Sequence, residues 1–209
     1  MSAFLNFYAT SLKKNPKTTN AIMTGSLFGL GDAIAQVSFP TQKADPTKPN
    51  GKSDSRGYDI ARTVRAITYG SLIFSFIGDK WFKTLNGKVK FANKPANHWS
   101  NLLLRVGTDQ LLFAPACIPF YFGVLTLMEG ESLQKADQKI RAVWWDILKT
   151  NWMVWPAFQL VNFSLVPLQH RLLAVNMLAI FWNTFLSFRN SEASNKDHQL
   201  PVEYPPVPE

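Results

Sequence analysis

Long stretches of this chain carry no charged residue, and their lengths predict membrane-spanning helices. Three of them, residues 110–128, 150–170 and 172–188, are 19, 21 and 17 residues long. A fourth, residues 18–42, contains a single charge, Asp32. A helix needs about 20 predominantly apolar residues, within a range of about 17–25, to cross the hydrocarbon core of a bilayer. Each of these four stretches is therefore long enough for one crossing.

A fifth uncharged stretch, residues 66–78, is shorter than the other four. At a rise of about 1.5 Å per residue it covers only about 20 Å of a core that is about 30 Å thick. A span in this region therefore has to include the flanking residues 62–80. Arg65 and Lys80 would then extend their charged groups toward the membrane surface.

The region from 150 to 188 allows two interpretations. One straight helix over this region would be about 58 Å long, which is too long for one crossing. Pro156 and Pro167 each favour a kink or a break, because proline lacks the backbone N–H that a helix uses. Either two spans meet near Arg171, or an interfacial or re-entrant segment precedes a single span.

The pattern therefore predicts an all-α, multi-pass transmembrane helical bundle of four spans, or of five. Composition agrees, since 46% of the 209 residues are hydrophobic and only 17% are charged, against about 25% in an ordinary soluble domain. A soluble all-α domain would have too little polar surface to cover so many apolar stretches. Three of the predicted spans are residues 18–37, 62–80 and 105–128. The remaining span is residues 150–169 or residues 171–188, or both of these are spans.

The segments outside the spans are polar or proline-rich. Residues 1–17 contain three lysines and no acidic residue, and their apolar side chains share one face of an amphipathic helix. This composition fits mitochondrial import, and it fits a plain juxtamembrane helix equally well. Residues 38–57 predict a hydrophilic loop, and residues 190–209 predict a disordered, proline-rich tail.

The formal net charge of +8 is spread along the chain rather than clustered. With four spans, each side of the membrane would hold about ten Lys and Arg residues, so the positive-inside rule gives no orientation. This charge suits anionic lipid headgroups better than nucleic acid, because the sequence contains no nucleic-acid-binding motif. We therefore expect the lipid bilayer as a partner and no direct contact with nucleic acid.

Sequence motifs for catalysis are absent. The sequence has no phosphate-binding loop, no G-x-S-x-G and no H-E-x-x-H, and its three histidines are isolated. A single cysteine, Cys117, excludes a disulfide framework and a metal site built from cysteines. We therefore expect no enzyme, no catalytic residue, no metal and no cofactor.

Small and polar residues follow one face of the first predicted span, at spacings of four, three and four residues. They are Gly25, Gly29, Asp32 and Gln36. Two small residues four positions apart let helices approach closely, and the same spacing recurs at Ala66 and Gly70. These glycines and this alanine are therefore candidates for helix packing, while the opposite, apolar face would contact lipid.

Polar side chains also lie within the other predicted spans. A charge in the bilayer interior costs at least about 2.5–3.5 kcal/mol, so such groups usually face the bundle interior or a water-filled path. With Asp32 and Gln36, the candidates are Asp109, Gln110, Gln159, Asn162, Arg171 and Asn183. Asp32 could pair with Arg171, or Asp109 with Arg105. The candidates either line an aqueous pathway or hold helices together by hydrogen bonds.

The order of these residues resembles that of the Mpv-type family of small membrane proteins, which includes the twenty-two-kilodalton peroxisomal membrane protein. Its first-half signature corresponds to Gly31-Asp32, Gln36, Arg62-Thr63, Arg65, Gly70 and Trp81-Phe82, followed by Asp109-Gln110 and Pro115. Its C-terminal signature corresponds to Trp155-Pro156, Gln159, Asn162-Phe163, Val166-Pro167, Arg171, Trp182-Asn183 and Leu186-Ser187. The resemblance covers about residues 5–190 and is greatest to a fungal, stress-induced branch.

The resemblance implies a multi-pass protein, usually with four spans, associated with weakly selective, water-filled channels for small metabolites. It also implies the mitochondrial inner membrane, a stress response and mitochondrial DNA maintenance, with the peroxisomal membrane as the alternative compartment. Small-metabolite solutes are thus expected partners, and a homo-oligomer is compatible with the sequence. Ser75-Phe76 replaces a Gly-Pro pair of the family, which argues against a kink there. With only Cys117, the internal disulfide proposed for some relatives cannot form.

Overall fold

The structure is a computed structural model, and it describes residues 3–40, 42–43, 54–55, 57–95, 98–165 and 171–199. These residues are almost entirely helical, as the sequence predicted. The exception is a pair of two-residue antiparallel strands, β1 (Gln42–Lys43) and β2 (Asp54–Ser55). Most of the predicted loop 38–57 and the end of the tail, residues 200–209, lie outside the described residues.

A short helix is followed by five long helical segments. Two of the long segments each contain a wide π-helical turn between two α-helices. The elements are α1 (Ala3–Lys14), α2 (Pro16–Ser38), α3 (Ile60–Thr68), η1 (Tyr69–Phe74), α4 (Ser75–Lys88), α5 (Trp99–Thr108), η2 (Asp109–Phe113), α6 (Ala114–Met128), α7 (Leu133–Ser164) and α8 (Arg171–Gln199).

Local chemistry explains where several helices begin. The Asp59 carboxylate accepts a hydrogen bond from the backbone N–H of Arg62 and caps α3. The Ser132 hydroxyl accepts one from the N–H of Lys135 and caps α7. Such caps satisfy N–H groups that the first helical turn cannot bond itself. Pro16 begins α2, at a position where its missing N–H costs nothing.

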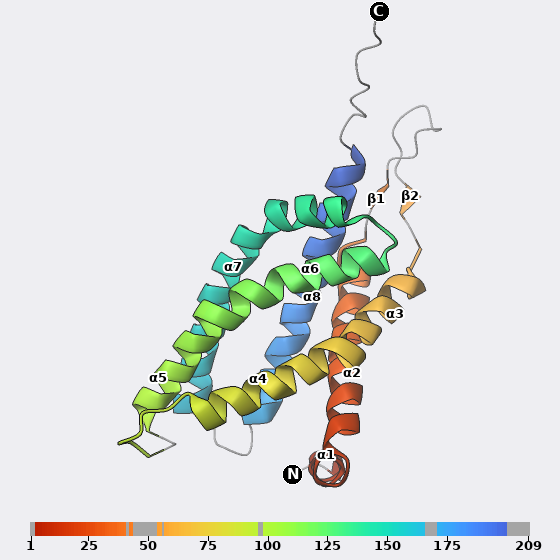
Figure 1. The fold of residues 1–209 in the computed structure, drawn as a ribbon. Coiled ribbons are helices and arrows are strands. Elements are labelled where there is room, and N and C mark those ends of the chain that lie inside the picture. The colour runs from red at the N-terminus through yellow and green to blue at the C-terminus, as the bar shows by residue number, and fades with distance from the viewer. Residues whose placement is uncertain are drawn as a thin grey trace, which may run out of the picture.

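The five long segments run alternately up and down and close into a ring (Figure 1). Around the ring, α2 packs on the segment α3–η1–α4, α6 on α7, α7 on α8, and α8 on α2, while α3 and α4 contact α6 and α5. Helix α1 is viewed end-on in Figure 1 and lies across the lower end of α2. The odd number of segments places the end of α8 opposite the beginning of α2.

Aromatic side chains fill the centre of the ring. The ring centroid of Phe28 lies 5.4 Å from that of Tyr69, which lies 5.1 Å from that of Tyr121. Phe74 packs on Phe28 at 5.4 Å, and Phe122 is fully buried beside Tyr121. Edge-on and tilted aromatic pairs at these distances contribute about 0.5–1.5 kcal/mol each beyond the apolar area they bury. We call these five residues the aromatic core.

Prolines in α6 leave backbone carbonyl groups free to accept hydrogen bonds from tryptophan side chains of α7. Pro119 has no N–H for the carbonyl of Pro115, and the indole Nε1 of Trp144 donates to that carbonyl at 3.1 Å. In the π-helical register of η2, the carbonyl of Gln110 would face Pro115, which also lacks an N–H. Trp152 donates its Nε1 to that carbonyl at 2.8 Å. Two backbone acceptors that proline leaves unpaired thus become contacts between helices.

Large apolar side chains also cover the outside of the bundle. Ile22 and Val37 of α2, Leu72 of η1 and Phe181 of α8 are among the exposed examples. An apolar outer surface of this extent suits lipid rather than water. By length and composition alone, one described segment, Trp99–Met128, could cross a membrane, and the predicted span 105–128 lies inside it.

Helix boundaries in the C-terminal part agree with the expected break near Arg171 and differ from the expected start of the tail. Helix α7 ends at Ser164 and α8 begins at Arg171, so the region 150–188 contains two helices; residues 166–170 lie outside the described residues. Helix α8 then continues to Gln199, so the first part of the predicted disordered tail is helical. Asn190 and Ser194 of this extension hydrogen-bond Glu129 and Lys139, and these contacts stabilise helix that the local sequence alone does not favour.

Candidate functional site

Asp32 is the centre of a buried hydrogen-bond network. Its side chain is only 1% exposed. Oδ1 accepts from Arg62 Nε at 2.7 Å and from the Ser187 hydroxyl, and Oδ2 accepts from Gln36 Nε2 at 2.8 Å and Thr63 Oγ1 at 2.7 Å. Arg62 Nη2 also donates to the Ser187 hydroxyl, at 2.9 Å. We call these five residues the carboxylate lock.

The carboxylate lock joins three helices. Asp32 and Gln36 belong to α2, Arg62 and Thr63 to α3, and Ser187 to α8. Each oxygen of Asp32 already accepts two hydrogen bonds, and Arg62 neutralises its charge. Among the two functions that the sequence left open, this geometry favours helix locking for Asp32 and Gln36, because a satisfied carboxylate has little capacity for a passing solute. The sequence suggested Arg171 as the partner of Asp32; the side chain of Arg171 is not among those that the structure describes.

Gly31 allows α8 to come close enough for Ser187 to reach Asp32. A Cβ atom at Gly31 would lie 2.6 Å from the Cβ of Asn183 and 2.9 Å from the backbone N of Thr184. Sequence reasoning selected neither Gly31 nor Ser187 as a site residue. The available signals were the family signatures, which include Gly31-Asp32 and Leu186-Ser187, and the position of Ser187 one helical turn after the candidate Asn183.

The candidate packing residues lie where α2 meets α3 and η1. A Cβ at Gly29 would lie 2.5 Å from the side chain of Ile67, and a Cβ at Gly70 would lie 3.0 Å from the backbone oxygen of Thr24. Gly25 directly faces Ser71 and the carbonyl of Ile67, and Ala66 is buried. Gly25 and Gly70 thus each approach the backbone of the neighbouring helix, which cannot move aside as a flexible side chain can.

Asp109 and Gln110 lie together in the π-helical turn η2. Asp109 accepts from Trp81 Nε1 at 2.8 Å and from Gln110 Nε2 at 3.0 Å. Arg105, considered as its partner, instead donates to the carbonyl of Val89 at 3.2 Å. Single π-helical turns inside α-helices are frequent at functional sites, because the extra residue redirects side chains.

A second group of buried polar side chains leaves acceptors unsatisfied. The amide oxygens of four residues are buried and accept no hydrogen bond within the described part of the chain. They are Gln110 of η2, Asn151 and Asn162 of α7, and Asn190 of α8, and we call them the amide row. An unpartnered buried acceptor costs about 1–3 kcal/mol, so each one calls for a donor beyond the described residues, such as water, or for a functional reason.

Two further candidates, Asn183 and Gln159, have described side chains. Asn183 is buried on α8, seven residues before Asn190 and so on the same helix face. Gln159 on α7 is half-buried. The buried Lys139 of α7 donates to Glu129 at 3.4 Å and to Ser194, near the end of α8, at 2.7 Å. Among the described residues, no group of three His, Cys, Asp or Glu side chains could hold a metal ion.

Comparison with known proteins places this arrangement in a family. The model of the Mpv17 / PMP22 family matches residues 126–187. Protein SYM1 of Saccharomyces cerevisiae is 58% identical over 205 residues, which cover 98% of either chain, and Protein SYM1 of Candida glabrata is 59% identical, covering 99% of either chain. Protein sym-1 of Neurospora crassa is 37% identical over 90% of this chain and 99% of its own.

No solved structure matches the chain. Neither the family description nor the names of these relatives denotes an enzyme. Two of the relatives are more than half identical to this chain and match it along nearly its whole length. Membership of a family of membrane proteins is consistent with the apolar outer surface of the bundle. The chain therefore belongs to the Mpv17/PMP22 family and is a membrane protein.

Proposed function

We propose that this protein provides a weakly selective, hydrated pathway for small metabolites across the mitochondrial inner membrane. The amide row carries the proposal. Four buried amide oxygens that find no donor among the described residues are costly in a dry interior, and water molecules or a polar solute would satisfy them. The family resemblance supports a mitochondrial membrane as the compartment.

The pathway would run along α7 and its contacts with η2 and α8. Asn151 and Asn162 are eleven residues apart, which places them on one face of α7 about 16 Å from each other. Trp152 binds the backbone of Gln110, so η2 lies beside Asn151. Asp109, Gln159 and Asn183 would line the same route. The carboxylate lock would act as its structural wall.

The aromatic core would form the constriction of this pathway. Tyr69 and Phe122 are fully buried, and the side chains around them leave the centre of the ring filled. The conformation described is then a closed one, and conduction requires these rings to move. A stress response and a contribution to mitochondrial DNA maintenance would follow indirectly, through the supply of small solutes.

Accessibility to water tests the pathway at depth. Single cysteines are introduced in a Cys117→Ala background at Asn151 and Asn162, and as a matched control at Gln36, which lies inside the carboxylate lock. We expect a membrane-impermeant thiol reagent to modify positions 151 and 162 at least tenfold faster than position 36. Mass spectrometry of the reconstituted protein measures the three rates. Protection of all three positions would contradict a hydrated pathway.

Replacement of an aromatic core residue tests the constriction. Tyr69→Ala removes a fully buried ring, and we expect it to raise basal conductance in planar bilayers and solute efflux from vesicles severalfold. Phe76→Ala is the matched control, because Phe76 is half-exposed on the outer side of the same helical segment. Equal conductance of the two variants would argue against a constriction at Tyr69.

A structural or scaffold protein of the same membrane is the second candidate function. The saturated carboxylate lock and the filled aromatic core favour it, since both are features of a permanently packed bundle. It predicts silent bilayers for the protein and for Tyr69→Ala, together with protection at all three cysteine positions.

Organelle fractionation with protease protection distinguishes the inner mitochondrial membrane from the peroxisomal membrane.

A further inference from the structure

Among the described residues, the two ends of the bundle carry similar numbers of basic residues but very different numbers of acidic ones. The lower end in Figure 1 comprises α1, residues 15–18, α4, residues 89–95 and α5. It contains nine Lys and Arg residues and one acidic residue, Asp79. We call it the basic end. Its basic residues are Lys13, Lys14, Lys17, Lys80, Lys83, Lys88, Lys90, Lys94 and Arg105.

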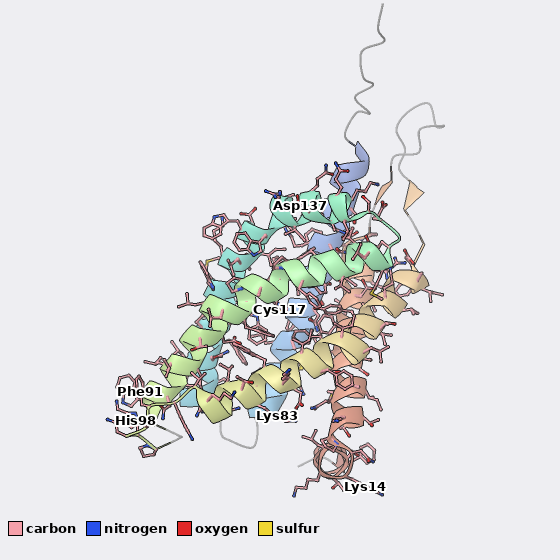
Figure 2. All side chains as sticks on the ribbon, in the orientation of Figure 1. Lys14, Lys83, Phe91, His98, Cys117 and Asp137 are labelled. Carbon is pink, nitrogen blue, oxygen red and sulfur yellow. The ribbon has the colours of Figure 1, made fainter. Side chains whose placement is uncertain are left out.

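The described part of the opposite end also carries nine Lys and Arg residues, but with eight acidic ones, and we call it the mixed end. It comprises β1, β2, residues 57–59 with α3, residues 129–149, and residues 189–199. In Figure 2, Lys14 and Lys83 mark the basic end and Asp137 the mixed end. A count of Lys and Arg alone therefore cannot distinguish the ends, whereas net charge does.

Charges at the mixed end neutralise one another. Lys135 pairs with Glu131 at 2.9 Å, Arg141 with Asp137 at 2.7 Å, and Lys149 with Asp146 at 2.9 Å. Lys149 lowers the pKa of Asp146, first by its hydrogen bond and then by its charge, so this carboxyl stays ionised at neutral pH. The field of the mixed end is consequently weak.

Charges at the basic end are left unbalanced. Among its described residues, only Lys83 pairs with a carboxylate, that of Asp79 at 2.6 Å. Lys13, Lys14, Lys17 and several others are exposed, and no described acidic side chain lies within ion-pair distance of them. Like charges held together repel one another, and an external anionic partner would relieve the repulsion.

The position of the basic end fits a membrane surface. Helix α2 is about 34 Å long, enough to reach from one face of a bilayer to the other. Helix α1 lies across the lower end of α2 (Figure 1), in the orientation of a helix that lies in the plane of the membrane surface. Its Phe7 side chain is 71% exposed. Lys13 and Lys14 follow in its last turn.

We propose that the basic end docks on anionic phospholipid headgroups of the leaflet that it faces. The phosphate groups of that leaflet complement the unpaired lysines, and the nearby Phe7 enters the interface between headgroups and acyl chains. The proposal rests on the membrane-crossing arrangement and is independent of conduction. It therefore holds for a channel and for a scaffold, and bilayer recordings do not decide it.

Lipid selectivity tests the docking. The full chain is reconstituted in phosphatidylcholine vesicles, and spin-labelled phosphatidylglycerol and phosphatidylcholine report the relative association constant of each lipid. We expect a preference for phosphatidylglycerol of at least threefold, which Lys13→Gln/Lys14→Gln/Lys17→Gln lowers at least twofold. The matched control, Lys135→Gln/Arg141→Gln/Lys149→Gln, removes as many positive charges from the mixed end and should leave the preference unchanged.

Three results of the lipid comparison would overturn the proposal, and so would a fourth, from competition with phosphate. The first three are no preference in the unaltered chain, an unchanged preference in the basic-end variant, and an equal loss in both variants, which would make total charge the cause. Inorganic phosphate, compared with chloride at equal ionic strength, should not abolish the preference; if it does, the lysines bind free phosphate instead. All substituted side chains are at least partly exposed, and circular dichroism verifies that each variant retains its helices.

Discussion

Replacing Arg62 by glutamine should destabilise the protein by about 3–5 kcal/mol, because it leaves the buried Asp32 carboxylate without its counter-ion. Asp32 is 1% exposed and Arg62 supplies the only basic side chain that contacts it within the described residues. Unfolding of the purified protein in detergent, followed by tryptophan fluorescence, measures the loss. The double variant Asp32→Asn/Arg62→Gln removes both charges and should recover a large part of it.

Arg141→Gln is the matched control for this experiment. Arg141 also pairs with an aspartate at 2.7 Å, but its side chain is 77% exposed. Exposed ion pairs contribute about 0–1 kcal/mol, since water and salt screen them. Equal destabilisation by Arg62→Gln and Arg141→Gln would show that the carboxylate lock does not hold the three helices together.

Replacing Gly31 by alanine should destabilise the bundle by about 1–3 kcal/mol, although only one methyl group is added. The methyl carbon would lie 2.9 Å from the backbone of α8, which has to move away from α2 to admit it. Because Gly31 precedes Asp32, this movement would also draw Ser187 away from the carboxylate. The same unfolding assay measures the effect.

Gly107→Ala provides the comparison for Gly31→Ala. A Cβ atom at Gly107 would meet no heavy atom within 4 Å beyond its own residue, its chain neighbours and the nearby backbone of its helix, and the residue lies inside α5. Alanine loses less conformational entropy than glycine in a helix, so this variant should be about 0.4–1 kcal/mol more stable. A neutral or stabilising Gly31→Ala would mean that α2 and α8 are not in close contact.

Much of the polar interior could be located from the sequence, but its partners could not. The spacing of Asp32 and Gln36 places them on one helix face, and this holds for any α-helix. The cation beside Asp32, however, is Arg62, which lies outside every uncharged stretch and thirty residues away along the chain. Hydrophobic periodicity predicts which face is buried and contains no information about which helix covers it.

The amide row illustrates the same division. Gln110 and Asn162 were recognisable as polar residues within apolar stretches. Asn151 lies in an uncharged stretch as well, residues 150–170, but was not among the candidates, and Asn190 lies outside every such stretch. Whether an amide is satisfied depends on neighbours from other helices, so the contrast between the saturated lock and the unsatisfied row becomes visible only in the folded chain.

The sequence by itself determined the helical class, the approximate positions of the long helices and the family, because apolar runs and residue order are properties of the chain. Only the tertiary structure decided how the helices pair, that α7 and α8 are separate, and that the acidic residues gather at one end. With an odd number of antiparallel segments, the last helix ends opposite the start of α2. The distribution of charge over the two ends therefore depends on topology, which local sequence patterns do not encode.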